Sequence, residues 1–119
     1  MRNNGEKRTS DRVQLEDFQR VRDAQSGKLI GYLGDISEVG VKVLCKTPVP
    51  LNETSRLKIT YIRIGGEREV TEVDVMSLWE RDEEDVPFHE IGFQFINLEE
   101  SAHEGVLRIM EDLERRRGD

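Results

Sequence analysis

The chain has 119 residues, of which 35% are hydrophobic and 36% charged, which suits one small domain with a strongly solvated surface and excludes two hydrophobic cores. Its net charge of −7 argues against sequence-independent binding of nucleic acid, because such binding depends on a surplus of lysine and arginine. No apolar run approaches the ~20 residues of a membrane-spanning helix, and residues 1–10 lack the apolar stretch of a signal peptide. The single cysteine, Cys45, has no partner for an internal disulfide. We therefore expect a cytoplasmic protein without membrane insertion.

Residues 1–11 are polar and predict a flexible N-terminal arm, followed by one domain over residues 12–119. Within that domain, alternation of apolar and polar side chains predicts six short strands separated by turns. These strands span about residues 12–21, 29–33, 39–45, 57–61, 70–79 and 88–96. The alternation in the fifth strand is offset near Glu72, which indicates a bulge.

Residues 67–90, which include the end of the fifth strand and the loop after it, carry ten acidic and two basic side chains. Residues 1–66 carry eight acidic and twelve basic ones, so the negative charge is concentrated in the second half of the chain. A run such as Asp82 to Asp85 usually forms a solvated loop, and we favour that interpretation. The functional alternative is a docking surface for a basic partner protein.

The sequence from about residue 98 to residue 116 changes to a helical period, with one apolar stripe formed by Ala102, Val106, Ile109, Met110 and Leu113. Asn97 and Glu100 have the spacing of a capping box. The three arginines at positions 115–117 suit the negative end of a helix dipole, and a solvated helix end is favoured over a binding patch. Six strands followed by one helix predict a mainly β fold, a small antiparallel barrel or sandwich with the helix over an open end or side.

Two short motifs carry candidate chemistry. Arg8 and Arg12 form R-x-x-x-R, which a chain with thirteen arginines contains roughly once by chance. Asp35, Ser37 and Gly40 form D-x-S-x-x-G, whose chance expectation is roughly 0.04 occurrences. Taken alone, the second motif favours a turn, because aspartate and serine bond local backbone groups and glycine adopts a positive φ.

On a β-rich chain that ends in a helix, the two motifs in this order resemble the PilZ domain, the bacterial receptor for the second messenger cyclic di-GMP. The resemblance extends from Lys7 to the C-terminal helix and includes Trp79 at the end of the fifth strand and the segment IGFQF at residues 91–95. It implies a six-stranded antiparallel PilZ-type β-barrel with a C-terminal α-helix. It also implies a cyclic di-GMP site formed by Lys7, Arg8, Arg12, Asp35, Ser37 and Gly40.

The roles that the resemblance implies agree with the chemistry of the ligand. Arg8 and Arg12 would contact phosphate and guanine, because a guanidinium fork matches a phosphate or the acceptor edge of guanine. Asp35 would accept hydrogen bonds from the donor edge of guanine, Ser37 would offer a hydroxyl, and Gly40 would allow close backbone approach. Lys7 stands where many members carry another arginine. With a basic residue at this position, the chain resembles those members that bind two stacked ligand molecules.

The resemblance also implies how a signal would pass. Because Arg8 lies in the polar arm, ligand binding would order the arm and create a surface for an unidentified effector protein. Motility, exopolysaccharide, pili and virulence are all outputs of the family, and the sequence does not choose among them. It also leaves open whether the protein is a monomer or a homodimer and whether one or two ligand molecules bind.

Catalysis is not expected, and neither is a metal site or a cofactor other than the ligand. His89 and His103 lack convincing cysteine or carboxylate partners at ligand spacing, and Cys45 is most simply a small strand residue. Two alternatives stay open. One is a PilZ-like adaptor that does not bind nucleotide, and the other is a small barrel that binds oligonucleotides, which would use basic stripes with exposed aromatic side chains.

Overall fold

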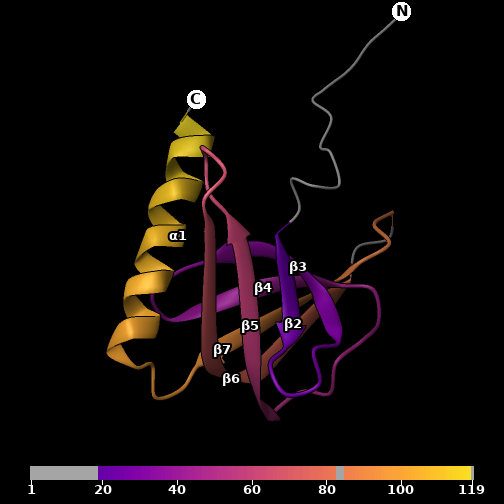
Figure 1. The fold of residues 1–119 in the computed structure, drawn as a ribbon. Helices are drawn as coiled ribbons and strands as arrows, with labels where there is room; N and C mark the ends of the chain where they lie inside the picture. The colour runs from indigo at the N-terminus through magenta and orange to yellow at the C-terminus, as the bar shows by residue number, and fades with distance from the viewer. Residues whose placement is uncertain (1–18, 83–84, 119) are drawn as a thin grey trace, which may run out of the picture.

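The computed structural model describes residues 19–82 and 85–118. In these ranges the chain forms six strands and one helix (Figure 1). The elements are β2 (Arg20–Asp23), β3 (Leu29–Ile36), β4 (Gly40–Cys45), β5 (Thr54–Ile62), β6 (Arg68–Asp82), β7 (His89–Phe95) and α1 (Glu100–Gly118). The N-terminal arm expected at residues 1–11, and most of the strand predicted over residues 12–21, lie outside the described residues.

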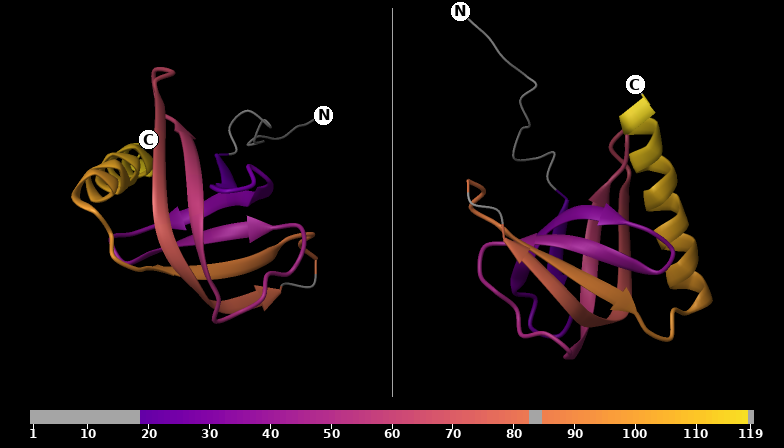
Figure 2. Two further views of the ribbon diagram at one scale, coloured as in Figure 1. Left: turned by 60° about the horizontal axis from the view of Figure 1, so that its bottom comes forward. Right: turned by 180° about the vertical axis from the view of Figure 1, so that it is seen from behind.

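The described strands close into one barrel in the order β2-β3-β4-β7-β6-β5, and every neighbouring pair is antiparallel. Pairing of β2 with both β3 and β5 completes the closure. Figures 1 and 2 show α1 along one side of this barrel, where it packs mainly against β6. The predicted mainly β fold, a six-stranded antiparallel barrel with a C-terminal helix, is therefore confirmed.

Strand alternation places one face of each strand in the barrel interior. The core contains β-branched and aliphatic side chains from all six strands together with Val106 and Ile109 of α1. Its fully buried members include Val21, Val43, Ile59, Val75 and Ile91. Among the residues that the structure describes, no helix is long and apolar enough to cross a membrane.

The bulge predicted near Glu72 is wrong in position. Glu72 pairs with Lys58 in regular register, and the register of β6 against β7 instead shifts between Ser77 and Trp79. Val70, which suggested the offset, is an exposed β-branched residue, while Thr71 takes the inward position. The real bulge moves Leu78 and Trp79 to the surface, which matters for the site described below.

The predicted capping box is also wrong. Asn97 has a φ of 48°, a left-handed conformation that an N-cap residue does not adopt. The helix begins at Glu100, and the backbone N–H of His103 donates to the carbonyl of Glu99 at 2.8 Å, so Glu99 is the N-cap. Asn97 instead forms the turn between β7 and the helix.

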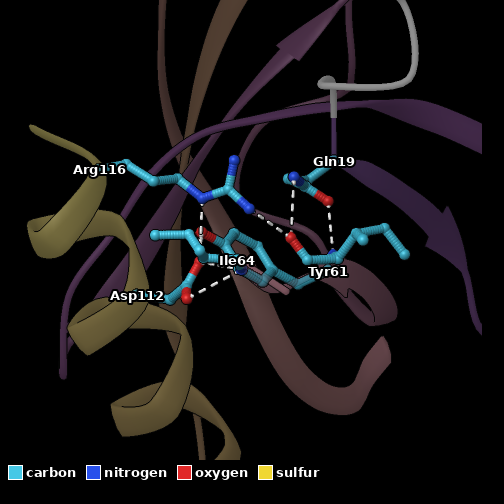
Figure 3. Close-up of polar contacts among 6 residues, drawn as sticks. Gln19, Tyr61, Ile64, Asp112 and Arg116 are labelled. Atoms are coloured by element: carbon cyan, nitrogen blue, oxygen red, sulfur yellow. Dashed lines mark hydrogen bonds and ion pairs between the residues drawn. The ribbon is translucent and has the colours of Figure 1, made fainter. Parts of the chain in front are cut away.

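One polar cluster attaches the C-terminal half of α1 to the end of β5 (Figure 3). Asp112, only 2% exposed, accepts hydrogen bonds from the Tyr61 hydroxyl at 2.8 Å, the Ile64 backbone N–H at 3.1 Å and Arg116 Nε at 2.9 Å. Arg116 also donates to the carbonyl of Ile62 at 2.6 Å, and its guanidinium lies 5.4 Å from the centre of the Tyr61 ring. The interpretation of residues 115–117 as a solvated helix end is therefore wrong for Arg116.

Cys45 is expected to be chemically inert in the folded protein. Its side chain is fully buried in β4, and this burial, together with the charge of Glu80, raises the pKa of its thiol to about 11. At pH 8 iodoacetamide should therefore leave the native protein unmodified and alkylate it completely in urea, as mass spectrometry can show. Equal alkylation rates in the native and unfolded protein would contradict a buried strand cysteine.

Candidate functional site

The D-x-S-x-x-G motif forms the connection between two neighbouring strands of the barrel. Asp35 lies near the end of β3, Ser37 in the turn, and Gly40 at the start of β4. The Ser37 N–H donates to the Gly40 carbonyl at 2.9 Å, and the Ser37 hydroxyl accepts from the Val39 N–H at 3.2 Å. The local bonds expected of a turn are therefore present.

Gly40 is required here for a different reason from the one that the turn suggested. Its φ is not among the positive values that the structure contains at Gly27, Gly65 and Gly66. A β-carbon at Gly40 would instead collide with the backbone carbonyl oxygen of Phe93 on β7. The glycine therefore lets β4 approach β7 closely at the edge of the site.

Asp35, Ser37 and Gly40 line one open pocket of about 390 Å³. Its other walls come from β4, β6 and β7 and include one lysine, two aromatic residues and three further residues: Lys42, Trp79, Phe93, Leu78, Gly92 and Gln94. The structure thus brings together the second motif and the two segments that supported the resemblance. Lys7, Arg8 and Arg12, the remaining candidate residues, lie outside the described residues.

Trp79 is a pocket residue that the sequence analysis noted at the end of a strand and in the family resemblance, but did not assign to the site. It is 42% exposed, and its neighbour Leu78 is 43% exposed, an unusual arrangement for two large apolar side chains in sequence. A β-carbon at Gly92 would collide with the Trp79 indole, so the missing side chain lets the ring lie against β7. The break in alternation at Ser77, Leu78 and Trp79 was the signal that could have predicted an exposed aromatic surface.

Asp35 is held as a carboxylate by its neighbours. Arg117 Nη2 of α1 donates to its Oδ1 at 2.8 Å, and the Ile36 N–H donates to the same oxygen at 2.9 Å. The hydrogen bond from Arg117 is the main cause that keeps the pKa of Asp35 below its ordinary value, helped by Ile36 and by the charge of Lys42 and opposed by partial burial. The site therefore presents an ionised acceptor at neutral pH.

A second cluster of titratable groups lies farther along β6 and β7. Glu80, Asp82 and His89 place one ligand atom each within 4.8 Å of one another, the one such group among the described residues. His89 Nδ1 lies 2.7 Å from Asp82 and 3.0 Å from Glu80. Sequence spacing missed these partners because they face His89 across a strand pair, in which Asp82 is its register neighbour. Contact of the His89 ring with these two carboxylates, which becomes an ion pair when the imidazole is protonated, accounts for the geometry.

This arrangement predicts that His89 titrates above its ordinary pKa of 6.5, chiefly because of its hydrogen bond to Asp82. A histidine with a raised folded pKa stabilises the protein fully below the unfolded pKa, and the contribution disappears as pH rises through the folded value. An NMR titration of the imidazole should show the raised pKa in the native chain and a lower one in Asp82→Asn. A native pKa at or below 6.5 would contradict the ion pairs.

A family model for the PilZ domain matches residues 6–112. The chain belongs to the PilZ domain family. The matched range includes both motifs and all six described strands of the barrel, and it confirms the resemblance that the sequence indicated. A search of curated protein sequences found no significant match.

Solved PilZ structures show the same fold. The PilZ domain of YcgR from Escherichia coli, solved with c-di-GMP, superposes with a TM-score of 0.59 at 22% identity, covering 87% of this chain and 87% of that one. A second structure, YcgR in complex with c-di-GMP from Escherichia coli, gives a TM-score of 0.61 at 16% identity over 83% of this chain and 42% of that chain. At these identities the comparison concerns the fold, so the ligand has to be argued from the site itself.

Proposed function

We propose that this PilZ protein is a receptor for cyclic di-GMP. The observation that carries the proposal is the convergence of Asp35, Ser37 and Gly40 with Trp79 in one open pocket. A volume of about 390 Å³ is in the ordinary range for pockets that bind small molecules. The family match, which also covers Arg8 and Arg12, and the two YcgR structures solved with c-di-GMP support the same ligand.

The pocket offers a complementary group for each part of the nucleotide. Asp35 would accept the N1–H and amino protons of one guanine, and the Trp79 indole would supply an aromatic face for a base. Lys42, which also pairs with Glu90 at 3.5 Å, adds positive charge at the pocket wall. Arg8 and Arg12 would bind the phosphates and the acceptor edge of guanine, with Lys7 beside them.

Recognition rather than catalysis is the proposed activity. Ligand binding by Arg8 and Arg12 would fix the segment that contains them against the barrel, and an effector protein would recognise the new surface. We place this receptor in the cytoplasm, where it acts as a monomer or a homodimer. The acidic region around Asp82 and Asp85 is a candidate face for a basic effector.

Calorimetric titration with cyclic di-GMP tests the proposal. The expected dissociation constant is near the micromolar level, which corresponds to a binding free energy of about 8 kcal/mol in magnitude. Cyclic di-AMP is the matched control, because adenine lacks the N1–H that Asp35 would accept. Arg8→Ala and Arg12→Ala should each weaken binding. No heat at high micromolar ligand would overturn the proposal in favour of a non-binding adaptor, whereas tight binding of single-stranded DNA at physiological salt would favour the oligonucleotide-binding alternative.

Trp79 provides an independent optical prediction. It is the one tryptophan of the chain, so its fluorescence reports on this pocket alone. We expect saturable quenching by cyclic di-GMP and, in Trp79→Ala, a roughly tenfold weaker affinity by calorimetry, because stacking of a base on an aromatic ring contributes ~1–3 kcal/mol. Unchanged fluorescence at saturating ligand would place the base away from Trp79.

A further inference from the structure

The C-terminal turn of α1 contacts the proposed nucleotide site through the ion pair of Arg117 with Asp35. Arg117 Nη2 lies 2.8 Å from Asp35 Oδ1 and joins the end of the helix to the end of β3. The sequence analysis treated Arg117 as part of a solvated helix end, and that interpretation is wrong for this residue as well. The contact matters because Asp35 is the residue that we expect to recognise guanine.

The hydrogen bonds of Asp35 leave little room for a further partner on its Oδ1 oxygen, which already accepts from two donors. A carboxylate oxygen offers about two acceptor positions. Oδ1 already accepts the Ile36 backbone N–H at 2.9 Å in addition to Arg117. Because Ile36 belongs to β3, its N–H is fixed by the strand, whereas the Arg117 side chain is flexible. A guanine that binds through both of its donors needs both carboxylate oxygens, so Arg117 is the group that has to leave.

We propose that Arg117 competes with cyclic di-GMP for Asp35, so that ligand binding releases the C-terminal end of α1 at Arg117 and Gly118. This inference rests on the proposed function. The release is confined to the end of the helix after Arg116, because Asp112 and Arg116, which lie five residues and one residue before Arg117, stay attached to Tyr61, Ile62 and Ile64 (Figure 3). The ligand is thereby coupled to a surface on the helix as well as to the segment that contains Arg8 and Arg12.

The strength of the pair sets the size of the effect. Asp35 and Arg117 side chains are 49% and 59% exposed, and exposed ion pairs are weak. Removing the competitor should therefore tighten ligand binding about two- to fivefold rather than by orders of magnitude. Linkage is reciprocal, so the ligand should loosen the end of the helix by the same factor.

The experiment compares calorimetric titrations of cyclic di-GMP into the native chain, Arg117→Ala and Arg115→Ala. Arg115 is the matched control: it lies on the same turn, is exposed, and its side chain has no hydrogen bond or ion pair to another described residue. We expect a two- to fivefold tighter affinity for Arg117→Ala alone. Removal of a positive charge ordinarily weakens the binding of an anion or leaves it unchanged. A tighter affinity of Arg117→Ala for cyclic di-GMP would therefore have no general electrostatic explanation. An equal or weaker affinity of Arg117→Ala would overturn the competition.

Hydrogen exchange gives a second measurement that does not depend on affinity differences. Amides of Arg117 and Gly118 should exchange faster in the native chain when cyclic di-GMP is bound, and Arg117→Ala should show no further change. Greater protection of these two amides with ligand would also overturn the competition. Binding by the native chain without these effects would reject only the role of Arg117, whereas failure of all three chains to bind would reject the proposed function and the competition with it.

Discussion

Replacing Asp35 with alanine is expected to weaken cyclic di-GMP binding about 100-fold. The substitution removes the acceptor for the two donors of guanine, and hydrogen bonds to a charged group contribute ~1.5–3 kcal/mol each. In the native chain, displacement of Arg117 offsets part of that gain. We therefore expect Asp35→Ala to lose about 3 kcal/mol of binding free energy. Calorimetric titration against the native protein measures it directly.

The matched control for this variant is Asp85→Ala, which removes the same charge from an exposed position after β6. It should leave nucleotide affinity unchanged. Because Asp35 is half exposed and lies at the end of a strand, its alanine variant should also keep the native circular dichroism spectrum and melting temperature within about 2 °C. A folded Asp35→Ala protein that binds as tightly as the native one would show that the D-x-S-x-x-G motif serves the turn alone.

The barrel could be predicted from the sequence because period-two alternation is strong wherever one face of a strand is buried. Leu57, Ile59 and Tyr61 alternate with polar residues and all three point into the core. The alternation misled at Val70, because a β-branched residue is favourable in a strand whichever face it occupies. The bulge at Leu78 was missed because Trp79 follows Val75 and Ser77 at period-two spacing, although the adjacent apolar pair Leu78 and Trp79 breaks the alternation.

The candidate site was predictable only in part. Asp35, Ser37 and Gly40 are close in sequence, so one short motif indicated them together. Trp79 and Arg117 reach the same place from β6 and α1, and nothing in local spacing connects residues that meet only when the barrel closes and the helix packs. The ion pair of Arg117 with Asp35, which spans 82 positions, is the kind of contact that a sequence pattern does not contain.

The largest stability effect is expected from Asp112→Ala. The native carboxylate is buried and accepts hydrogen bonds from Tyr61, Ile64 and Arg116, so its removal leaves three donors without their acceptor. Loss of one partner from a buried charged cluster costs ~3–5 kcal/mol, and the partial exposure of Arg116 reduces this to about 2–4 kcal/mol. Urea unfolding followed by circular dichroism should show that loss, together with a melting temperature lower by roughly 10 °C.

The control for this prediction is Glu111→Ala, an exposed acidic residue adjacent in the same helix, which should change stability by less than ~0.5 kcal/mol. The effect should also depend on pH. Burial raises the pKa of Asp112, but hydrogen bonds from Arg116, Tyr61 and Ile64 outweigh it and hold the pKa below its ordinary value. Its stabilisation is therefore present above the unfolded pKa and is lost as pH falls through the folded one. Stability of the native chain and of Asp112→Ala should converge in strong acid, and a gap that stayed constant down to pH 2 would show that the side chain acts by packing rather than by its charge.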